Sequence, residues 1–184
     1  MRSCFVLCFI VFSLQVSGKD AQKTHWRIWP FFQSVPKPDT LTLEHDLAMR
    51  PFITDTISVE AIKQLLGEGF QVFKTSIPNR FVAGQVDTLI TIRKGHSYIR
   101  LYAVSKSEKL FYEQAEINDP LPVFKRSMCI GQTKSDIRKC LPELTGTKTI
   151  PDNILIMDAN GMDYLFLSFA KDKLQKVVFQ PYLD

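Results

Sequence analysis

The sequence predicts an α+β protein made of tandem duplicated units, each a helix packed on an antiparallel β-meander. Two helical patterns, at 58–67 and 133–141, each precede a run of strand patterns joined by short polar turns. The segments 87–103 and 153–169 align with each other without a gap. Of the 184 residues, 45% are hydrophobic and 23% charged, which is typical of a soluble globular protein with a sizeable core.

Residues 1–18 have the pattern of a cleavable signal peptide. Arg2 gives a positive start, residues 4–16 are largely apolar, and residues 16–18 end in small side chains. The apolar stretch is shorter than the ~20 residues of a membrane-spanning helix. We therefore expect a periplasmic or secreted protein with no transmembrane segment after cleavage. The alternatives are an uncleaved anchor and a lipid attached to a cysteine of this stretch.

Residues 19–54 are expected to form an irregular N-terminal arm rich in aromatic residues and proline. Prolines at 30, 36 and 38 argue against a regular helix or a central strand there. A short strand followed by loop is predicted within 41–57. The aromatic side chains of the arm either pack on the protein's own core or form an exposed contact surface. They are Trp26, Trp29, Phe31 and Phe32.

The first predicted unit covers residues 55–122 and begins with a helix. Ser58 is a suitable N-cap, and Gly67 ends the helix because glycine accepts the left-handed conformation. The apolar stripe of this helix consists of Val59, Ile62, Leu65 and Leu66. Strands are expected at 70–73, 86–92, 97–104 and 110–117, with polar turns between them.

The second predicted unit covers residues 123–184 and repeats this order. Thr133 can cap a helix whose first turn carries Asp136, where a carboxylate favours the helix dipole. The stripe of this helix consists of Ile137, Cys140 and Leu141. Strands are expected at 153–158, 163–170 and 173–180, with a hairpin turn at Asn160-Gly161.

Matching residues in the two units favour duplication over a chance similarity between two strand-rich halves. The aligned pairs are Leu89 with Leu155, Ile90 with Ile156, Gly95 with Gly161, Tyr98 with Tyr164, and Leu101 with Leu167. Upstream, Ser58 aligns with Thr133 at a slightly larger offset. A helix with an apolar stripe buries it against a sheet, so two such units would share or juxtapose their sheets.

Only Cys129 and Cys140 remain after the predicted cleavage. In an oxidising compartment they can form one disulfide, which would staple the segment between them. The alternative is a pair of reduced, buried thiols that behave as small apolar side chains. Their spacing fits neither a redox motif nor a zinc site.

The second unit resembles the β-lactamase-inhibitor-protein-like superfamily, which includes small outer-membrane assembly lipoproteins. The resemblance is carried by residues 130–137 (IGQTKSDI), 163–169 (DYLFLSF), 173–174 and 177–179. The first unit matches more loosely, since Thr56 stands where such units have a glycine. The resemblance implies duplicated α+β units. In the inhibitor branch, the sheet and its hairpin loops bind an enzyme, and other branches bind envelope proteins.

The sequence contains no G-x-S-x-G, H-E-x-x-H or phosphate-loop motif. The formal net charge of +4 is carried by scattered lysines and arginines, which excludes a nucleic-acid-binding patch. The densest ionisable cluster, residues 44–46, is interpreted as a solvated loop in preference to a base or a metal site. Asp152, Asp158 and Asp163 are interpreted as turn residues because their spacing is not that of a calcium loop.

We therefore expect a non-enzymatic protein-binding module of the bacterial periplasm or cell envelope, with an inhibitor or immunity protein as one version. The alternatives are a structural envelope-assembly protein and a secreted hydrolase with an unrecognised site. The expected partner is another protein, with no nucleic acid, cofactor or metal. The candidate contact residues are Tyr98, Tyr102, Tyr112 and Tyr164, with His96 and Met162 at equivalent hairpin tips.

Overall fold

The computed structural model describes residues 39–79, 82–107 and 109–183. All of them lie in one compact unit, Pro36–Asp184. The predicted signal peptide (1–18) and the aromatic part of the arm (26–32) lie outside the described residues. Within the described ranges, no helix has the length and apolar content needed to cross a membrane.

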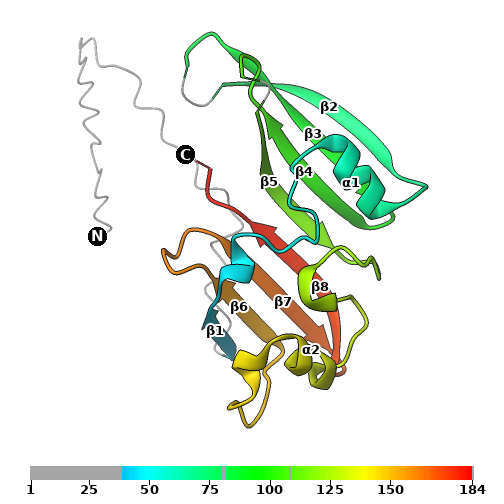
Figure 1. The fold of residues 1–184 in the computed structure, drawn as a ribbon, viewed down its shortest axis with the longest axis vertical. Coiled ribbons are helices and arrows are strands. Elements are labelled where there is room, and N and C mark those ends of the chain that lie inside the picture. The colour runs from blue at the N-terminus through cyan, green and yellow to red at the C-terminus, as the bar shows by residue number, and fades with distance from the viewer. Residues whose placement is uncertain (1–38, 80–81, 108, 184) are drawn as a thin grey trace, which may run out of the picture. The chain divides into compact units, whose positions relative to one another are not determined.

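One eight-stranded sheet organises the unit (Figure 1). Its strand order is β1-β6-β7-β8-β5-β4-β3-β2, and all neighbours are antiparallel except β1 and β6. The α+β class and the two antiparallel meanders, β2 to β5 and β6 to β8, are confirmed. The strands are β1 (Thr40–Glu44), β2 (Gln71–Pro78), β3 (Val86–Lys94), β4 (Ser97–Ala103), β5 (Leu110–Ile117), β6 (Asn153–Met157), β7 (Tyr164–Ala170) and β8 (Lys173–Gln180).

Both predicted helices form, with the predicted caps. In α1 (Val59–Leu66) the Ser58 side chain accepts a hydrogen bond from the Ala61 N–H at 3.0 Å. In α2 (Lys134–Cys140) Thr133 and Asp136 form a reciprocal capping box. These local bonds satisfy N–H groups that have no partner inside the helix, which is why the sequence alone predicted both starts.

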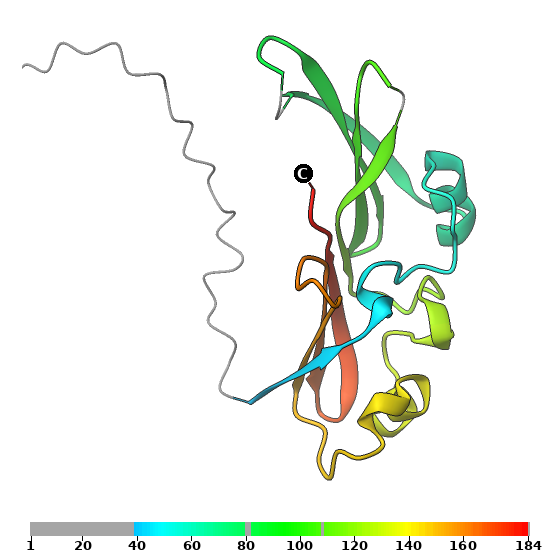
Figure 2. The same ribbon diagram turned by 60° about the vertical axis from the view of Figure 1, so that its left-hand side comes forward.

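The helices cover one face of the sheet, as Figure 2 shows. Ile62 and Leu66 of α1 and Ile137 of α2 are buried beneath them. Alternate strand residues complete this core, including Ile99 and Leu101 on β4, Leu165 and Leu167 on β7, and Val177 and Phe179 on β8. Because strand side chains alternate, the residues between these point to the opposite face.

An aromatic cluster joins the two meanders where β5 pairs with β8. The Phe52 ring lies 5.0 Å from the Tyr112 ring on β5 and 5.6 Å from the Phe179 ring on β8, centroid to centroid. Phe124 stacks on Phe52 at 5.6 Å, and a β-bridge links the backbones of these two residues. Burial of these rings holds the segment before α1 and the segment before α2 to the same part of the sheet.

The short strand predicted within 41–57 forms as β1, at the start of that range. Its parallel pairing with β6 over five residues was not predicted, and a second strand is longer than expected. The strand predicted at 70–73 extends to Pro78 as β2. β2 lies at the edge of the sheet and six of its eight residues are exposed, so it lacks the apolar alternation that sequence analysis requires.

Candidate functional site

The sheet face that no described helix covers (Figure 2) is a candidate contact surface, and we term it the open face. Strand alternation and register define its residues. They include Leu155 and Met157 on β6, Tyr164, Phe166 and Ser168 on β7, Lys176, Val178 and Gln180 on β8, Gln114 and Glu116 on β5, Tyr98 and Arg100 on β4, and Thr91 and Arg93 on β3.

An apolar row crosses three strands of the open face. Leu155 on β6 pairs with Phe166 on β7, which in turn pairs with Val178 on β8. All three side chains are partly exposed, whereas Leu165 and Leu167, on either side of Phe166, are fully buried in the core. Single exposed apolar side chains are ordinary, but contiguous ones mark contact surfaces.

Ion pairs occupy the open face next to the apolar row. Glu116 lies 3.1 Å from the Lys176 ammonium, and Arg100 lies 3.2 Å from the Glu113 carboxylate. Burial alone would raise the pKa of Glu116, but the Asn118 amide and Lys176 outweigh it, and this pKa is lowered. These four charges beside the apolar row are thus paired with each other, which favours apolar contact next to them.

Two of the predicted tyrosines belong to the open face. Tyr98 is half-buried, with the Arg100 guanidinium 5.3 Å from its ring centroid. Burial raises the pKa of Tyr98. Tyr164 donates a hydrogen bond from its hydroxyl to the Gly161 carbonyl at 2.5 Å. Both rings are therefore held in place before any partner arrives.

The other two predicted tyrosines are inside the protein. Tyr102 is buried, and its hydroxyl donates to Asp87. Tyr112 points into the aromatic cluster, and burial raises its pKa to about 12. A bulge in the β4–β5 register places Glu113 as an extra residue, so Tyr112 faces the core although Gln114 faces outward. Neither tyrosine presents a contact surface in this conformation.

The two predicted hairpin tips are exposed, but the topology separates them. His96 follows the end of β3 and Met162 precedes β7; their neighbours Tyr98 and Tyr164 pair toward the C-terminal ends of β5 and β8 respectively. β5 and β8 are antiparallel, so these ends point in opposite directions. The tips therefore cannot form one contact site with each other.

Each tip is held by an aspartate. The Asp119 carboxylate accepts hydrogen bonds from the His96 N–H at 2.8 Å and the Ser97 hydroxyl at 2.6 Å. Asp158 accepts from the N–H groups of Met162 at 2.6 Å and Asp163 at 2.9 Å. These bonds lower the pKa of both Asp119 and Asp158. The carboxylates fix turn geometry.

A serine, a histidine and an aspartate meet at the first tip without forming a catalytic arrangement. The Ser97 hydroxyl donates to Asp119 and accepts from the N–H groups of Asn118 and Asp119, both at 3.0 Å. A nucleophilic serine would instead donate to the histidine. Ser97 is also fully buried, so substrate has no access to it.

Of residues 44–46, interpreted as a solvated loop, Glu44 and Asp46 are exposed, but His45 is not. The His45 side chain is only 11% exposed, and its Nε2 lies 3.0 Å from Glu143 and 2.6 Å from Arg126. Its Nδ1 accepts from the Leu47 N–H at 2.8 Å and so caps the short 3₁₀ turn η2 (Asp46–Ala48). Arg126 and Glu143 could not be predicted as partners of His45, because they lie far from it along the chain and leave no local signal.

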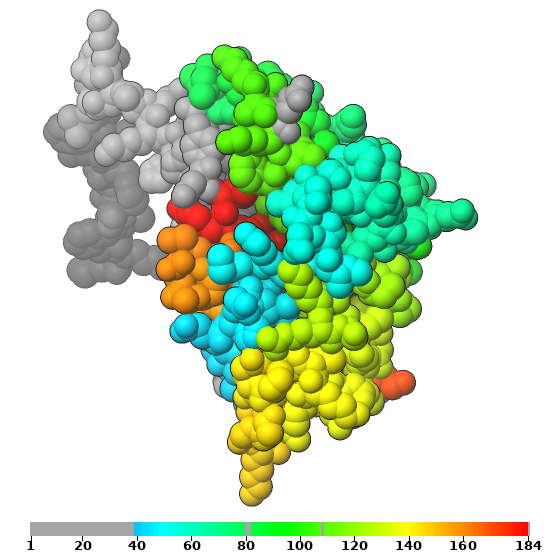
Figure 3. Space-filling model, viewed as in Figure 1, coloured from blue at the N-terminus to red at the C-terminus, as the bar shows by residue number. Residues whose placement is uncertain are grey.

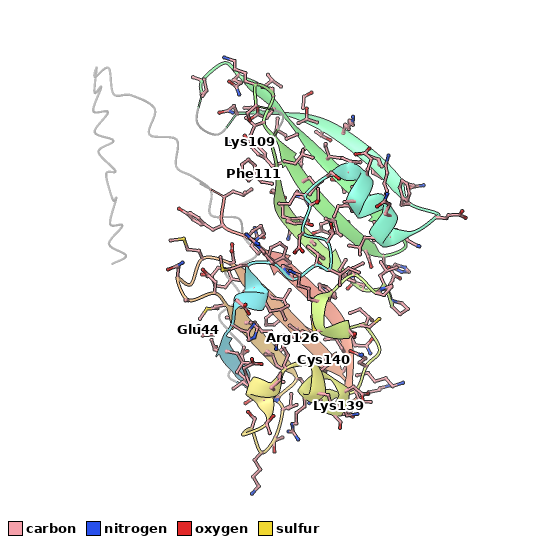
Figure 4. All side chains as sticks on the ribbon, in the orientation of Figure 1. Glu44, Lys109, Phe111, Arg126, Lys139 and Cys140 are labelled. Carbon is pink, nitrogen blue, oxygen red and sulfur yellow. The ribbon has the colours of Figure 1, made fainter. Side chains whose placement is uncertain are left out.

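This cluster joins segments that are distant in sequence. In Figure 3 the cyan segment after β1 lies against the yellow-green and yellow segments that precede and include α2. Arg126, which has a positive φ of 58°, donates to the Cys140 carbonyl at the end of α2, and Figure 4 labels the two residues side by side. The contacts among His45, Arg126 and Glu143 thus hold the end of β1 against the C-terminal end of α2.

Neither cysteine is bonded to the other; both are free thiols. Burial raises the pKa of Cys129 and of Cys140. The Cys129 thiol donates to the Leu121 carbonyl at 3.7 Å. A raised pKa leaves little thiolate at neutral pH, which disfavours a nucleophilic role.

The three aspartates considered for calcium serve the structure separately. Asp152 pairs with Lys134 at 2.7 Å, Asp158 holds the hairpin tip, and Asp163 accepts from the Tyr182 N–H at 2.9 Å. Within residues 39–79, 82–107 and 109–183, no group of three or more His, Cys, Asp or Glu side chains is arranged to hold a metal. The turn interpretation accounts for each of them.

No family model matches the chain, and no curated protein or solved structure matches it.

Proposed function

We propose that the chain is a non-enzymatic protein-binding module of the bacterial periplasm or cell envelope, and that the open face is its contact surface. The observation that carries the proposal is the apolar row of Leu155, Phe166 and Val178 on the face opposite the helices. Tyr98 and Tyr164 flank it on the same face. Aromatic side chains beside apolar ones are the usual anchors of protein interfaces.

The hydrogen bonding of the buried carboxylate of Asp87 supports binding over catalysis. Asp87 is buried and accepts hydrogen bonds from Asn79 at 2.5 Å, Gln85 at 3.2 Å and the Ser105 N–H at 3.0 Å. Burial alone would raise the pKa of Asp87, but hydrogen bonds from Ser105, Tyr102 and Gln85 lower it. A carboxylate held ionised by several donors is a poor acid or base at neutral pH.

Rigidity supports an inhibitor or immunity role as the specific version of this function. The open face consists of paired strands whose positions do not depend on a partner, so little conformational entropy is lost on binding. Such a surface blocks a partner's cleft by shape and burial, without covalent chemistry. Export through the predicted signal peptide would bring the module to an envelope or secreted partner.

We further propose that the two halves of the sheet are duplicated copies, as in the β-lactamase-inhibitor-like superfamily. The strand order supports this, since β2-β3-β4-β5 on one side is mirrored by β1-β6-β7-β8 on the other. In each half a capped helix precedes the meander along the chain. β1 takes the place beside β6 that β2 takes beside β3, although the direction of pairing differs.

Site-specific photo-crosslinking tests the proposed surface. Phe166 is replaced by benzoylphenylalanine in the full chain, which is irradiated in cells that make it naturally. The matched control carries the same group at Lys148, in an exposed loop after α2. We expect a discrete protein adduct from position 166 and none from position 148. Equal adducts from both positions, or none from position 166, would count against the open face as the contact surface.

A further inference from the structure

β2 is a long sheet edge with an open side. It pairs with β3 through all eight residues without a bulge and stands last in the strand order, so no described strand lies on its other side. Its only proline is the last residue, Pro78. Proteins usually protect such edges by short strands, bulges, prolines or several charges, and β2 carries only Lys74.

The direction of the backbone groups along β2 follows from one hydrogen bond. The Asn79 N–H donates to the Gln85 carbonyl at 2.8 Å, toward the β3 side. Backbone direction alternates along a strand, so the odd-numbered residues of β2 also face β3. The even-numbered residues therefore point their backbone groups away from the sheet: Val72, Lys74 and Ser76 present both N–H and C=O, and Pro78 presents its C=O alone.

From this arrangement we infer that β2 pairs with β2 of a second copy of the chain, antiparallel, with Thr75 opposite Thr75. In this register Lys74 of each copy lies opposite Ser76 of the other, and each of these two pairs exchanges backbone hydrogen bonds. Phe73, which is 48% exposed, meets Ile77 of the second copy on both sides of the centre. Aromatic with β-branched, and threonine with threonine, are favoured cross-strand pairs.

Charge disfavours one of the two neighbouring registers. Shifting the centre to residue 74 places Lys74 directly opposite Lys74, and like charges in that position repel. With Thr75 at the centre, each Lys74 instead meets the uncharged Ser76. A two-fold axis through Thr75 also keeps the open faces of both copies on the same side of the joined sheet.

Cysteine crosslinking of the purified full-length mature protein tests the register. At the centre the two Thr75 Cα atoms would be ~4.5 Å apart in a non-hydrogen-bonded pair, within the range of a disulfide. Thr75→Cys should therefore give a disulfide dimer under mild oxidation. Ser76→Cys is the matched control, because two Ser76 residues would lie ~7–8 Å apart and would not bridge.

Sedimentation velocity of the unmodified chain provides the second readout. The wild-type chain should dimerise as its concentration rises. Ser76→Pro removes an outward N–H but none of the bonds to β3, so it should weaken the dimer ~10-fold or more. The inference would be overturned if the wild-type chain stays monomeric and Thr75→Cys is no more crosslinked than Ser76→Cys. The edge of β2 would then be free to pair with a strand of another protein.

Discussion

Truncation of Phe52 to alanine is predicted to destabilise the fold severely, because this ring joins both meanders. Phe52 is 1% exposed. Its ring centroid lies within 5.0–5.6 Å of the rings of Tyr112, Phe124 and Phe179. Tyr112 belongs to β5 and Phe179 to β8, so a cavity at Phe52 opens directly over the pair of strands that unites the two halves of the sheet.

The size of the loss follows from burial and ring contacts. Phe→Ala in a core costs about 3–5 kcal/mol in free energy of unfolding. Each aromatic pair adds ~0.5–1.5 kcal/mol beyond burial, and Phe52 makes three such pairs, which favours the upper part of that range, about 4–5 kcal/mol. For a chain of this size each kcal/mol lowers the Tm by about 2–4 °C, so the expected drop is about 8–20 °C.

Urea unfolding followed by far-UV circular dichroism measures the free energy, and scanning calorimetry measures the Tm. Ile53→Ala is the matched control, since this neighbouring side chain is 53% exposed and should cost less than about 1 kcal/mol. Equal losses in the two variants would refute the argument that the Phe52 ring anchors the junction of β5 and β8.

Two further predictions concern a turn and a helix cap. Gly95 has a φ of 58°, and a Cβ there would lie 2.8 Å from the Asp119 carboxylate, so Gly95→Ala should cost about 2 kcal/mol in urea unfolding. Gly84→Ala, with φ 79° and open space, should cost about half as much, and equal effects would contradict the clash. Lys139 and Thr133 lower the pKa of Asp136 from 3.8 to about 2, so its ionised form stabilises the fold above about pH 4 and this contribution is lost as the pH falls toward 2. The stability difference between wild type and Asp136→Asn should therefore shrink from about pH 5 to about pH 2, and a constant difference would contradict the assigned role.

Local signals explain which parts of the fold the sequence predicted. The helix starts at Ser58 and Thr133 depend on hydrogen bonds within four residues, and both were predicted correctly. The predicted hairpin at Asn160-Gly161 forms between β6 and β7, with Gly161 at φ 65°. Features whose cause lies within one turn of chain are legible in the sequence.

Features that depend on distant contacts were missed. A short strand within 41–57 was predicted, but the parallel pairing of residues 40–44 with residues 153–157 was not, because a pairing across such a separation leaves no local pattern. The charged neighbours of His45 in sequence suggested that it is exposed. Arg126 and Glu143, from elsewhere in the chain, contact it instead.

The candidate site was predicted in part for the same reason. Tyr98 and Tyr164 follow the strand alternation that the sequence displays, and both lie on the open face. Tyr112 does not, because the bulge at Glu113 shifts the alternation by one residue. Phe166 and Val178 were not singled out, since a partly exposed apolar row becomes visible only when the register of β7 and β8 is known.

The dissociation constant between this chain and the protein captured at position 166 tests the central claim most directly. Burial of the partly exposed Phe166 ring at an interface contributes about 2 kcal/mol, so Phe166→Ala should weaken binding about 30-fold. Lys148→Ala should leave the dissociation constant unchanged. An unchanged constant for Phe166→Ala, in a variant that remains folded, would contradict binding through the open face.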